Sequence, residues 1–196
     1  MIYFKQFYPI RFKKYSKPLD VKLVIGLLTG KTEYFTVIRS MLEKTYGPCD
    51  LVSPIFDFHH TNYYEEEFGS DLKKMFFSFR DLKTLTNIYK IKLFTNRIEN
   101  NFKTCSKRQV NIDPGFISHS KLALFTTKDY SHRIYLHDGI FAEVTLKYEQ
   151  NSFAPWPWTY PDYKTKEYIE FFNKVRMLYC ENMQSTPIKD KIQSCC

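Results

Sequence analysis

The first half of the chain has a hydrophobic pattern that changes from strand-like to helix-like and back. Residues 21–28 (VKLVIGLL) form a short apolar run rich in β-branched residues, which predicts a buried strand. Apolar residues then recur at helical spacing over residues 32–44, and a Gly-Pro pair follows them, so we expect a helix that ends there. Residues 51–58 have the composition of a second strand, which Pro54 would bend or confine to a sheet edge. The opening of the chain is therefore predicted to be β-α-β.

The middle of the chain is predicted to contain one more strand and two helices. Residues 74–79 (KMFFSF) are apolar and aromatic, as expected of a third strand. Aspartate is a residue type that caps helices, so we expect a helix from Asp81 to about Ile91. A further helix is expected over residues 95–102.

The second half of the chain alternates polar and apolar residues over short segments. These segments predict strands at residues 110–112, 121–127, 132–136 and 140–148. An Asp-Gly pair separates the last two strands and is typical of a two-residue hairpin turn. A proline-rich stretch then precedes an amphipathic helix over residues 165–178. Together the elements predict an α/β fold of the α+β type: a β-α-β opening followed by a largely antiparallel sheet with helices packed on it.

Length and composition are those of one folded domain. In a chain of 196 residues we expect a globular domain over residues 20–181, a basic N-terminal extension over residues 1–19 and a C-terminal tail over residues 182–196. Hydrophobic residues make up 43% and aromatic residues 18% of the chain, which is too much for a disordered protein. No apolar run reaches the roughly 18 to 20 residues that a membrane helix needs, so the sequence predicts no membrane span.

The net charge of +8 is concentrated in the N-terminal extension. Five basic residues and no acidic residue precede Asp20, so residues 20–196 carry a net charge of +3. A nucleic-acid-binding domain usually carries its positive excess on a folded face, and the nearly balanced domain weakens an RNA-binding interpretation. The five cysteines include no C-x-x-C pair, which indicates neither a zinc site nor a disulfide framework. We expect reduced thiols and a cytoplasmic location.

One segment is close to a phosphate-binding loop without matching it. Residues 26–32 (GLLTGKT) follow the first predicted strand and precede the first helix, as a P-loop does. A P-loop needs four residues between its glycines, whereas Gly26 and Gly30 enclose three. That spacing places the backbone N–H groups around the phosphates, so we interpret the segment as an ordinary strand-to-helix turn. Adjacent histidines on a strand point to opposite faces, so His59-His60 does not indicate a metal site either.

Residues 111–143 carry the densest polar chemistry of the domain, and any site is expected here. The candidate ligand-binding residues are Lys121, Lys128, Asp129 and Arg133. The candidate catalytic residues are Asp113, His132 and Glu143. Lys and Arg would hold phosphate or carboxylate groups, and a histidine would act as general acid or base near neutral pH. The sequence leaves the cofactor unknown and indicates no metal site. It lacks a nucleophile motif, which favours phosphoryl or phosphodiester chemistry over acyl transfer.

Each of these residues also has a structural interpretation. Asp113 starts an Asp-Pro-Gly sequence, which is typical of a tight turn that the aspartate stabilises. Arg133 and Glu143 fall near the same rungs of the predicted hairpin, where they would form a cross-strand ion pair. His132 would point to the opposite face of the strand from Arg133 and serve as a hydrogen-bonded packing residue.

Several segments of the domain resemble one bacterial and archaeal family of uncharacterised proteins. The segments that carry the resemblance are DLVSPIFDF, TNYYEEEFG, IKLFTNRIE, VNIDPGFIS, KLALFTTKDYSHRIYL, GIFAEVTL and PWTYPDY. The resemblance spans residues 21–179, which is nearly the whole domain. It implies little about function, because family members carry at most an automatic label of GTP-binding protein, for which the incomplete P-loop is a poor basis.

Three functions are consistent with these features. The favoured one is the binding or processing of a phosphorylated small molecule, such as a nucleotide, through residues 111–143. The second is a non-catalytic interaction protein, in which the polar segment only stabilises the hairpin and a partner binds an exposed apolar patch. The third is an RNA-binding module that uses the basic extension together with exposed aromatic residues. The sequence indicates neither an oligomeric state nor whether the protein is an enzyme.

Overall fold

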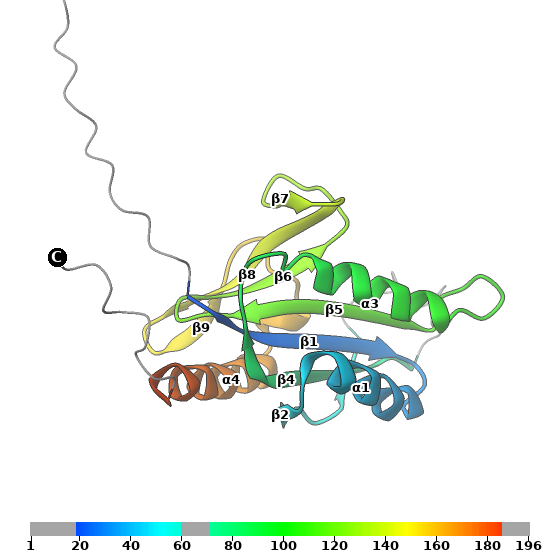
Figure 1. Cartoon of the computed structure of the whole chain (residues 1–196), viewed down its shortest axis with the longest axis horizontal. Helices are drawn as coiled ribbons and strands as arrows, with labels where there is room; N and C mark the ends of the chain where they lie inside the picture. Colours follow the sequence, from blue (N-terminus) through cyan, green and yellow to red (C-terminus); the bar gives the residue numbers. More distant parts are fainter. Residues whose placement is uncertain (1–18, 60–70, 186–196) are drawn as a thin grey trace, which may run out of the picture.

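The computed structural model describes residues 19–59 and 71–185. In this part of the chain, nine strands form one sheet: β1 (Val21–Thr29), β2 (Cys49–Val52), β3 (Phe56–Asp57), β4 (Lys73–Lys83), β5 (Val110–Ile117), β6 (Lys121–Thr126), β7 (Ile134–His137), β8 (Ile140–Glu149) and β9 (Ser152–Pro155). The helices are α1 (Glu33–Tyr46), α3 (Lys90–Asn101), α4 (Lys166–Ser185) and the short 3-10 helix η2 (Asp162–Lys164). The α+β fold that the sequence predicts is confirmed (Figure 1).

The strand order is β2-β4-β1-β5-β6-β8-β7, and every neighbouring pair is antiparallel. Strand β3 pairs with β4, and β9 pairs with β8. Because β1 and β2 are both antiparallel to β4, they run parallel to each other with β4 between them. The predicted β-α-β opening is therefore present in a split form, in which a later strand fills the space between the two parallel strands.

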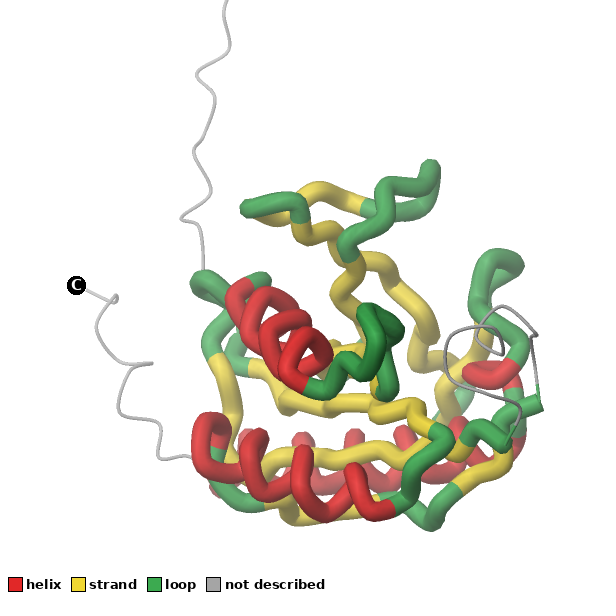
Figure 2. The backbone as a smooth tube through the Cα atoms, turned by 90° about the vertical axis from the view of Figure 1, so that its right-hand side faces the viewer, coloured by secondary structure: helices red, strands yellow, loops and turns green. Residues whose placement is uncertain are grey.

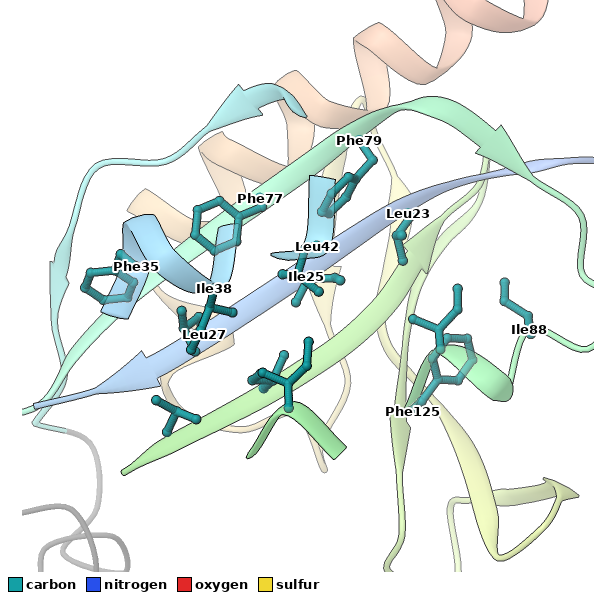
Figure 3. Packing of buried hydrophobic residues seen from close by; sticks show 14 of the residues in the cluster. Leu23, Ile25, Leu27, Phe35, Ile38, Leu42, Phe77, Phe79, Ile88 and Phe125 are labelled. Atoms are coloured by element: carbon teal, nitrogen blue, oxygen red, sulfur yellow. The ribbon is translucent and has the colours of Figure 1, made fainter. Parts of the chain in front are cut away.

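Strand β1 is buried on both faces of the sheet, which explains its continuous apolar run. Leu23, Ile25 and Leu27 pack with α1, α3 and the inner residues of β4 in one hydrophobic cluster. Figure 3 shows these side chains meeting between α1 and the sheet, with α4 on the other side. Val24 points the opposite way and packs with Phe76 and the apolar face of α4 in a second cluster. A strand that is covered on both faces has no solvent-facing positions and does not alternate.

Strands β5 and β6 pair over only three rungs, from Gly115↔Leu124 to Ile117↔Leu122. Beyond them, β6 stays paired with β8, and the ribbon formed by β6, β8 and β7 rises away from the plane of β1 and β5 (Figures 1 and 2). Gly115 lies where the two strands separate, and a Cβ atom there would collide with the Ala123 carbonyl oxygen and lie 2.7 Å from Leu124 Cδ2. A side chain at this position would push the strands apart, so glycine sets how closely they approach.

Two predictions about local structure are wrong. Strand β4 continues to Lys83, which pairs with Val21, and a single helix Lys90–Asn101 replaces the two helices expected over residues 81–91 and 95–102. The ladder with β1 therefore overrides the capping tendency of Asp81. The Asp-Pro-Gly sequence that starts at Asp113 is not a turn either, because it lies inside β5 and pairs with β1. Turn-forming residues are a weak signal when neighbouring strands offer continuous pairing.

The segment that resembles a P-loop is an ordinary strand and turn, as the sequence predicts. Gly26 lies in the middle of β1, where it pairs with Phe76 on one side and Asp113 on the other, so it takes no part in a loop.

Of the helices in the described ranges, none has the length and apolar character that a membrane span requires.

Replacing Gly115 by alanine should lower the free energy of unfolding by about 3 kcal/mol, the upper end of overpacking costs, because the new Cβ collides with backbone. Gly139 is the matched control: it has a positive φ of 73°, but no atom lies within 4 Å of the position that an added Cβ would take, so Gly139→Ala should cost about 1 kcal/mol. Urea unfolding of both variants measures the difference. Equal losses would show that β5 and β6 do not need this close approach.

Candidate functional site

A cavity of about 550 Å³ lies where β6 separates from β5. Its walls come from α3, β5, the end of β6 with the loop that follows, β8, and the segment leading into η2. The charged lining residues are Lys74, Lys92, Glu99, Arg108, Asp113, Lys128, Arg133, Glu143 and Asp162. Small-molecule sites are typically cavities of about 300–1,000 Å³, so the size suits a small ligand.

Lys92 and Glu99 of α3 take the place of the missing strand at the open edge of β5. The Glu99 Oε1 atom accepts a hydrogen bond from the Ile112 N–H at 2.8 Å, and Lys92 Nζ donates to the Ile112 carbonyl oxygen at 2.6 Å. Both backbone groups would otherwise be buried without a partner, which is costly. Pro114 lies two residues further along β5, so its backbone nitrogen points to the same side as that of Ile112, away from β1. Pairing with β6 begins only at Gly115, so the N–H that proline lacks costs the sheet no hydrogen bond.

Lys92 reaches the cavity with hydrogen-bonding capacity left over. Its Nζ atom lies 3.6 Å from Glu99 Oε1 and 3.9 Å from Asp113 Oδ1, both longer than a good hydrogen bond. An ammonium group has three donors, and the Ile112 carbonyl takes one of them at short distance. The side chain is 8% exposed, so its charge acts in surroundings that water screens weakly.

Asp113 is the carboxylate of the cavity with the most room. Asn111 Nδ2 donates to its Oδ2 atom at 2.7 Å, while its Oδ1 atom has the distant Lys92 ammonium as neighbour. The Asp113 side chain is 30% exposed, whereas those of Glu99, Glu143 and Asp162 are at most 6% exposed. Asp113 can therefore accept a hydrogen bond or a proton from a bound molecule.

Lys74 forms the floor of the cavity together with Asp162. Its Nζ atom lies 2.7 Å from Asp162 Oδ2, and the ring centroids of four aromatic residues surround it at 4.5–5.8 Å: Phe58, Phe76, Tyr163 and Tyr168. The Tyr163 hydroxyl is buried and has no hydrogen-bond partner among the residues that the structure describes. Burial, and then the negative charge of Asp113 and Asp162, raises the pKa of Tyr163 well above its usual value. Tyr163 therefore stays a neutral O–H donor at this wall.

Arg133 and Glu143 form a buried pair that holds the rim of the cavity. Arg133 Nε donates to Glu143 Oε2 at 2.7 Å, and both side chains are 2% exposed. The guanidinium also donates to the Lys128 carbonyl oxygen and to the Tyr160 hydroxyl, each at 3.0 Å, and stacks on the Tyr130 ring at 4.4 Å. Arg133 thus ties the loop after β6 and the segment before η2 to strand β8. Most of its donors are already engaged.

The structure brings four of the seven predicted site residues to the cavity: Asp113, Lys128, Arg133 and Glu143. His132 does not line the cavity; its ring stacks on Trp158, and its Nε2 atom lies 3.4 Å from Glu143 Oε2, the oxygen that Arg133 also contacts. The prediction that His132 and Arg133 point to opposite faces is therefore wrong, because β7 begins at Ile134 and both residues precede it. Lys121 and Asp129 do not line the cavity either, and Lys121 pairs with Lys147 at the other end of β6.

Sequence reasoning missed the part of the site that comes from α3 and β4. Lys92 and Glu99 are buried, on the same face of α3 as Ile91 and Ile98, so charged residues interrupt an apolar stripe. Lys74 precedes Phe76 by two residues in β4 and shares its inward direction. The sequence signal for these residues is a charged residue at a position that periodicity directs into the core. Such a residue needs a buried partner and therefore indicates a buried polar cluster.

A family model described as "Domain of unknown function (DUF4416)" matches residues 19–179. The match covers most of the chain, so the chain belongs to this family, which confirms that its sequence resembles a family of uncharacterised proteins. No curated protein and no solved structure matches the chain.

Arg133→Met should lower the free energy of unfolding by about 3–5 kcal/mol, because it leaves the Glu143 charge buried without its partner. The double variant Arg133→Met/Glu143→Leu should recover much of the loss, since it removes both charges. Arg39→Met is the control: Arg39 pairs with Glu43 on the surface of α1, and its loss should cost less than about 1 kcal/mol. Urea unfolding gives all three values. A double variant no more stable than Arg133→Met would contradict this account of the pair.

Proposed function

We propose that this member of the DUF4416 family binds or processes a small phosphorylated or otherwise anionic molecule, such as a nucleotide, in the cavity between β5 and β6. The observation that carries the proposal is Lys92, a cation on the cavity wall that has one short hydrogen bond and faces its carboxylate neighbours at 3.6 and 3.9 Å. A phosphate or carboxylate oxygen would give this ammonium a better acceptor than either neighbour does.

The overall charge of the cavity supports an anionic ligand that also has polar donors. Five cationic and four carboxylate side chains line it, so the charged residues sum to +1 when all are ionised. Asn96, Asn111 and Thr126 add neutral polar groups to the same walls. A balance of this kind suits a ligand with a negative group and several hydroxyl or amine groups, because carboxylates accept hydrogen bonds from such groups.

Any chemistry on the bound molecule would fall to Asp113. Glu143 accepts from Arg133 with Oε2 and from the Thr145 hydroxyl with Oε1, so both of its oxygens are engaged. His132 would act through Glu143, whose charge it contacts, and would not touch the ligand. Asp113 is the more exposed carboxylate and has an oxygen directed at Lys92, which suits a general base beside a cation that holds an oxyanion.

A second candidate function is a non-catalytic interaction protein, and strand β7 favours it. Ile134 is 72%, Tyr135 57% and Leu136 36% exposed, and β7 pairs with β8 along one side only. An exposed apolar edge strand is a common docking surface for another strand. Native mass spectrometry would test it, since a stable complex or dimer that Ile134→Lys abolishes would favour this function.

The RNA-binding alternative relies on residues 1–18, which lie outside the described residues.

Lys92→Gln should weaken the binding of anionic ligands about tenfold or more, because the ionic contact is lost while the amide can still donate to Ile112. Asp113→Asn should leave binding unchanged or tighten it, since it removes a negative charge from the wall. The probes are orthophosphate, tripolyphosphate, ATP and GTP, measured by isothermal titration calorimetry after native mass spectrometry of the purified protein has identified any co-purified molecule.

The matched control is Lys90→Gln, which removes the same charge from an exposed position of the same helix. It should change the dissociation constants less than twofold. Circular dichroism verifies that each variant is folded. The proposal fails if none of the four probes binds, or if Lys92→Gln and Lys90→Gln affect binding equally.

A further inference from the structure

We infer that the ligand of this cavity carries a planar ring, and that Tyr160 is the surface on which this ring stacks. The inference rests on the proposed function and narrows it to nucleotides, with the base against Tyr160 and the phosphates directed toward Lys92. Both residues line the same cavity but come from segments far apart in the sequence.

Tyr160 is held in place without its ring being used. Its hydroxyl accepts a hydrogen bond from Arg133 at 3.0 Å, and its carbonyl oxygen accepts from the Tyr163 N–H at 3.1 Å. Arg133 is itself fixed by Glu143, and Pro161 restricts the backbone directly after Tyr160. A ring that is already oriented loses little conformational entropy when a ligand stacks on it.

The other aromatic rings near the rim stack on one another or on cationic side chains. Tyr130 stacks on the Arg133 guanidinium and lies beside His132, which stacks on Trp158. Trp158 in turn stacks on Trp156, with ring centroids 5.1 Å apart and an interplanar angle of 5°. Lys147 closes this series over the Trp156 ring at 4.8 Å. Each ring of this series thus has at least one stacking partner, and the series stabilises the rim.

Tyr160 differs from that series in its ring contacts. Both Tyr160 and Tyr130 line the cavity, and they are 45% and 52% exposed, but only Tyr130 has a cation against its ring. Within the described ranges the Tyr160 ring has no aromatic or cationic partner. Apolar side chains continue the wall beside these polar groups: Leu28, Phe58, Leu124, Phe125 and Pro161. A cavity with a half-exposed fixed ring, apolar wall and buried cations matches a molecule that is flat and apolar at one end and anionic at the other.

Tyr160→Leu should weaken the binding of ATP or GTP roughly 5- to 150-fold, the range that base–aromatic stacking gives, and should leave tripolyphosphate binding unchanged within twofold. Tyr160→Phe should keep most of the affinity, because it loses only the hydroxyl and retains the ring. The comparison of these two variants separates stacking from the hydrogen bond with Arg133. Tyr135→Leu is the control, since Tyr135 is exposed on β7 and does not line the cavity.

Wild-type protein should bind at least one of the two nucleotides more tightly than it binds tripolyphosphate. Equal affinity for nucleotides and tripolyphosphate, or equal weakening of both by Tyr160→Leu, would overturn the stacking inference while leaving anion binding intact. If none of orthophosphate, tripolyphosphate, ATP and GTP binds to the wild-type protein, the proposed function fails together with this inference.

Discussion

The open edge of β5 is the constraint on which the rest of the site depends. Strand β6 leaves β5 after three rungs, so the backbone groups of Ile112 face a gap instead of a neighbouring strand. Buried backbone groups must be paired, and α3 supplies Lys92 and Glu99 to pair them. A strand would have satisfied the same groups with neutral amides. Side chains satisfy them with full charges, and the space that the absent strand leaves becomes a cavity with ionised walls.

These buried charges do little for the stability of the fold. A buried ion pair gains in attraction roughly what it loses in desolvation, so replacing it with apolar residues is often neutral or favourable. The stability of the fold comes from the two hydrophobic clusters, which pack on the two faces of the sheet. The cavity lies outside them, where β6 separates from β5. The fold nevertheless contains three buried pairs of opposite charge, which packing alone does not require: Lys74–Asp162, Arg133–Glu143 and Lys92–Glu99. Their concentration around one cavity is the physical argument for a binding site.

Sequence patterns predict the fold better than they predict the site. The apolar runs at β1 and β4 and the hairpin of β7 and β8 follow from local periodicity and turn chemistry, and these elements were predicted correctly. The helices between β4 and β5 were misplaced, because strand pairing with β1 outweighs the preference of Asp81 for a cap. Of the candidate site, the sequence singles out residues such as Asp113 and Arg133, which line the cavity. The sequence does not single out Lys92, because its position at the cavity depends on where β6 departs from β5, and no local pattern encodes that departure.

Arg133 and Lys92 both line the cavity, but their hydrogen bonds differ, and this difference decides which of them we expect to contact an anionic ligand. Arg133 lies in the polar segment that the sequence singles out, but its donors are engaged with Glu143, a backbone carbonyl and Tyr160. An anion that binds Arg133 would compete for its donors with the Glu143 carboxylate, the Lys128 carbonyl oxygen and the Tyr160 hydroxyl. Lys92 has donors to spare and needs no such exchange. Arg133 therefore orients the rim, and Lys92 is the cation that an oxyanion reaches with the least rearrangement.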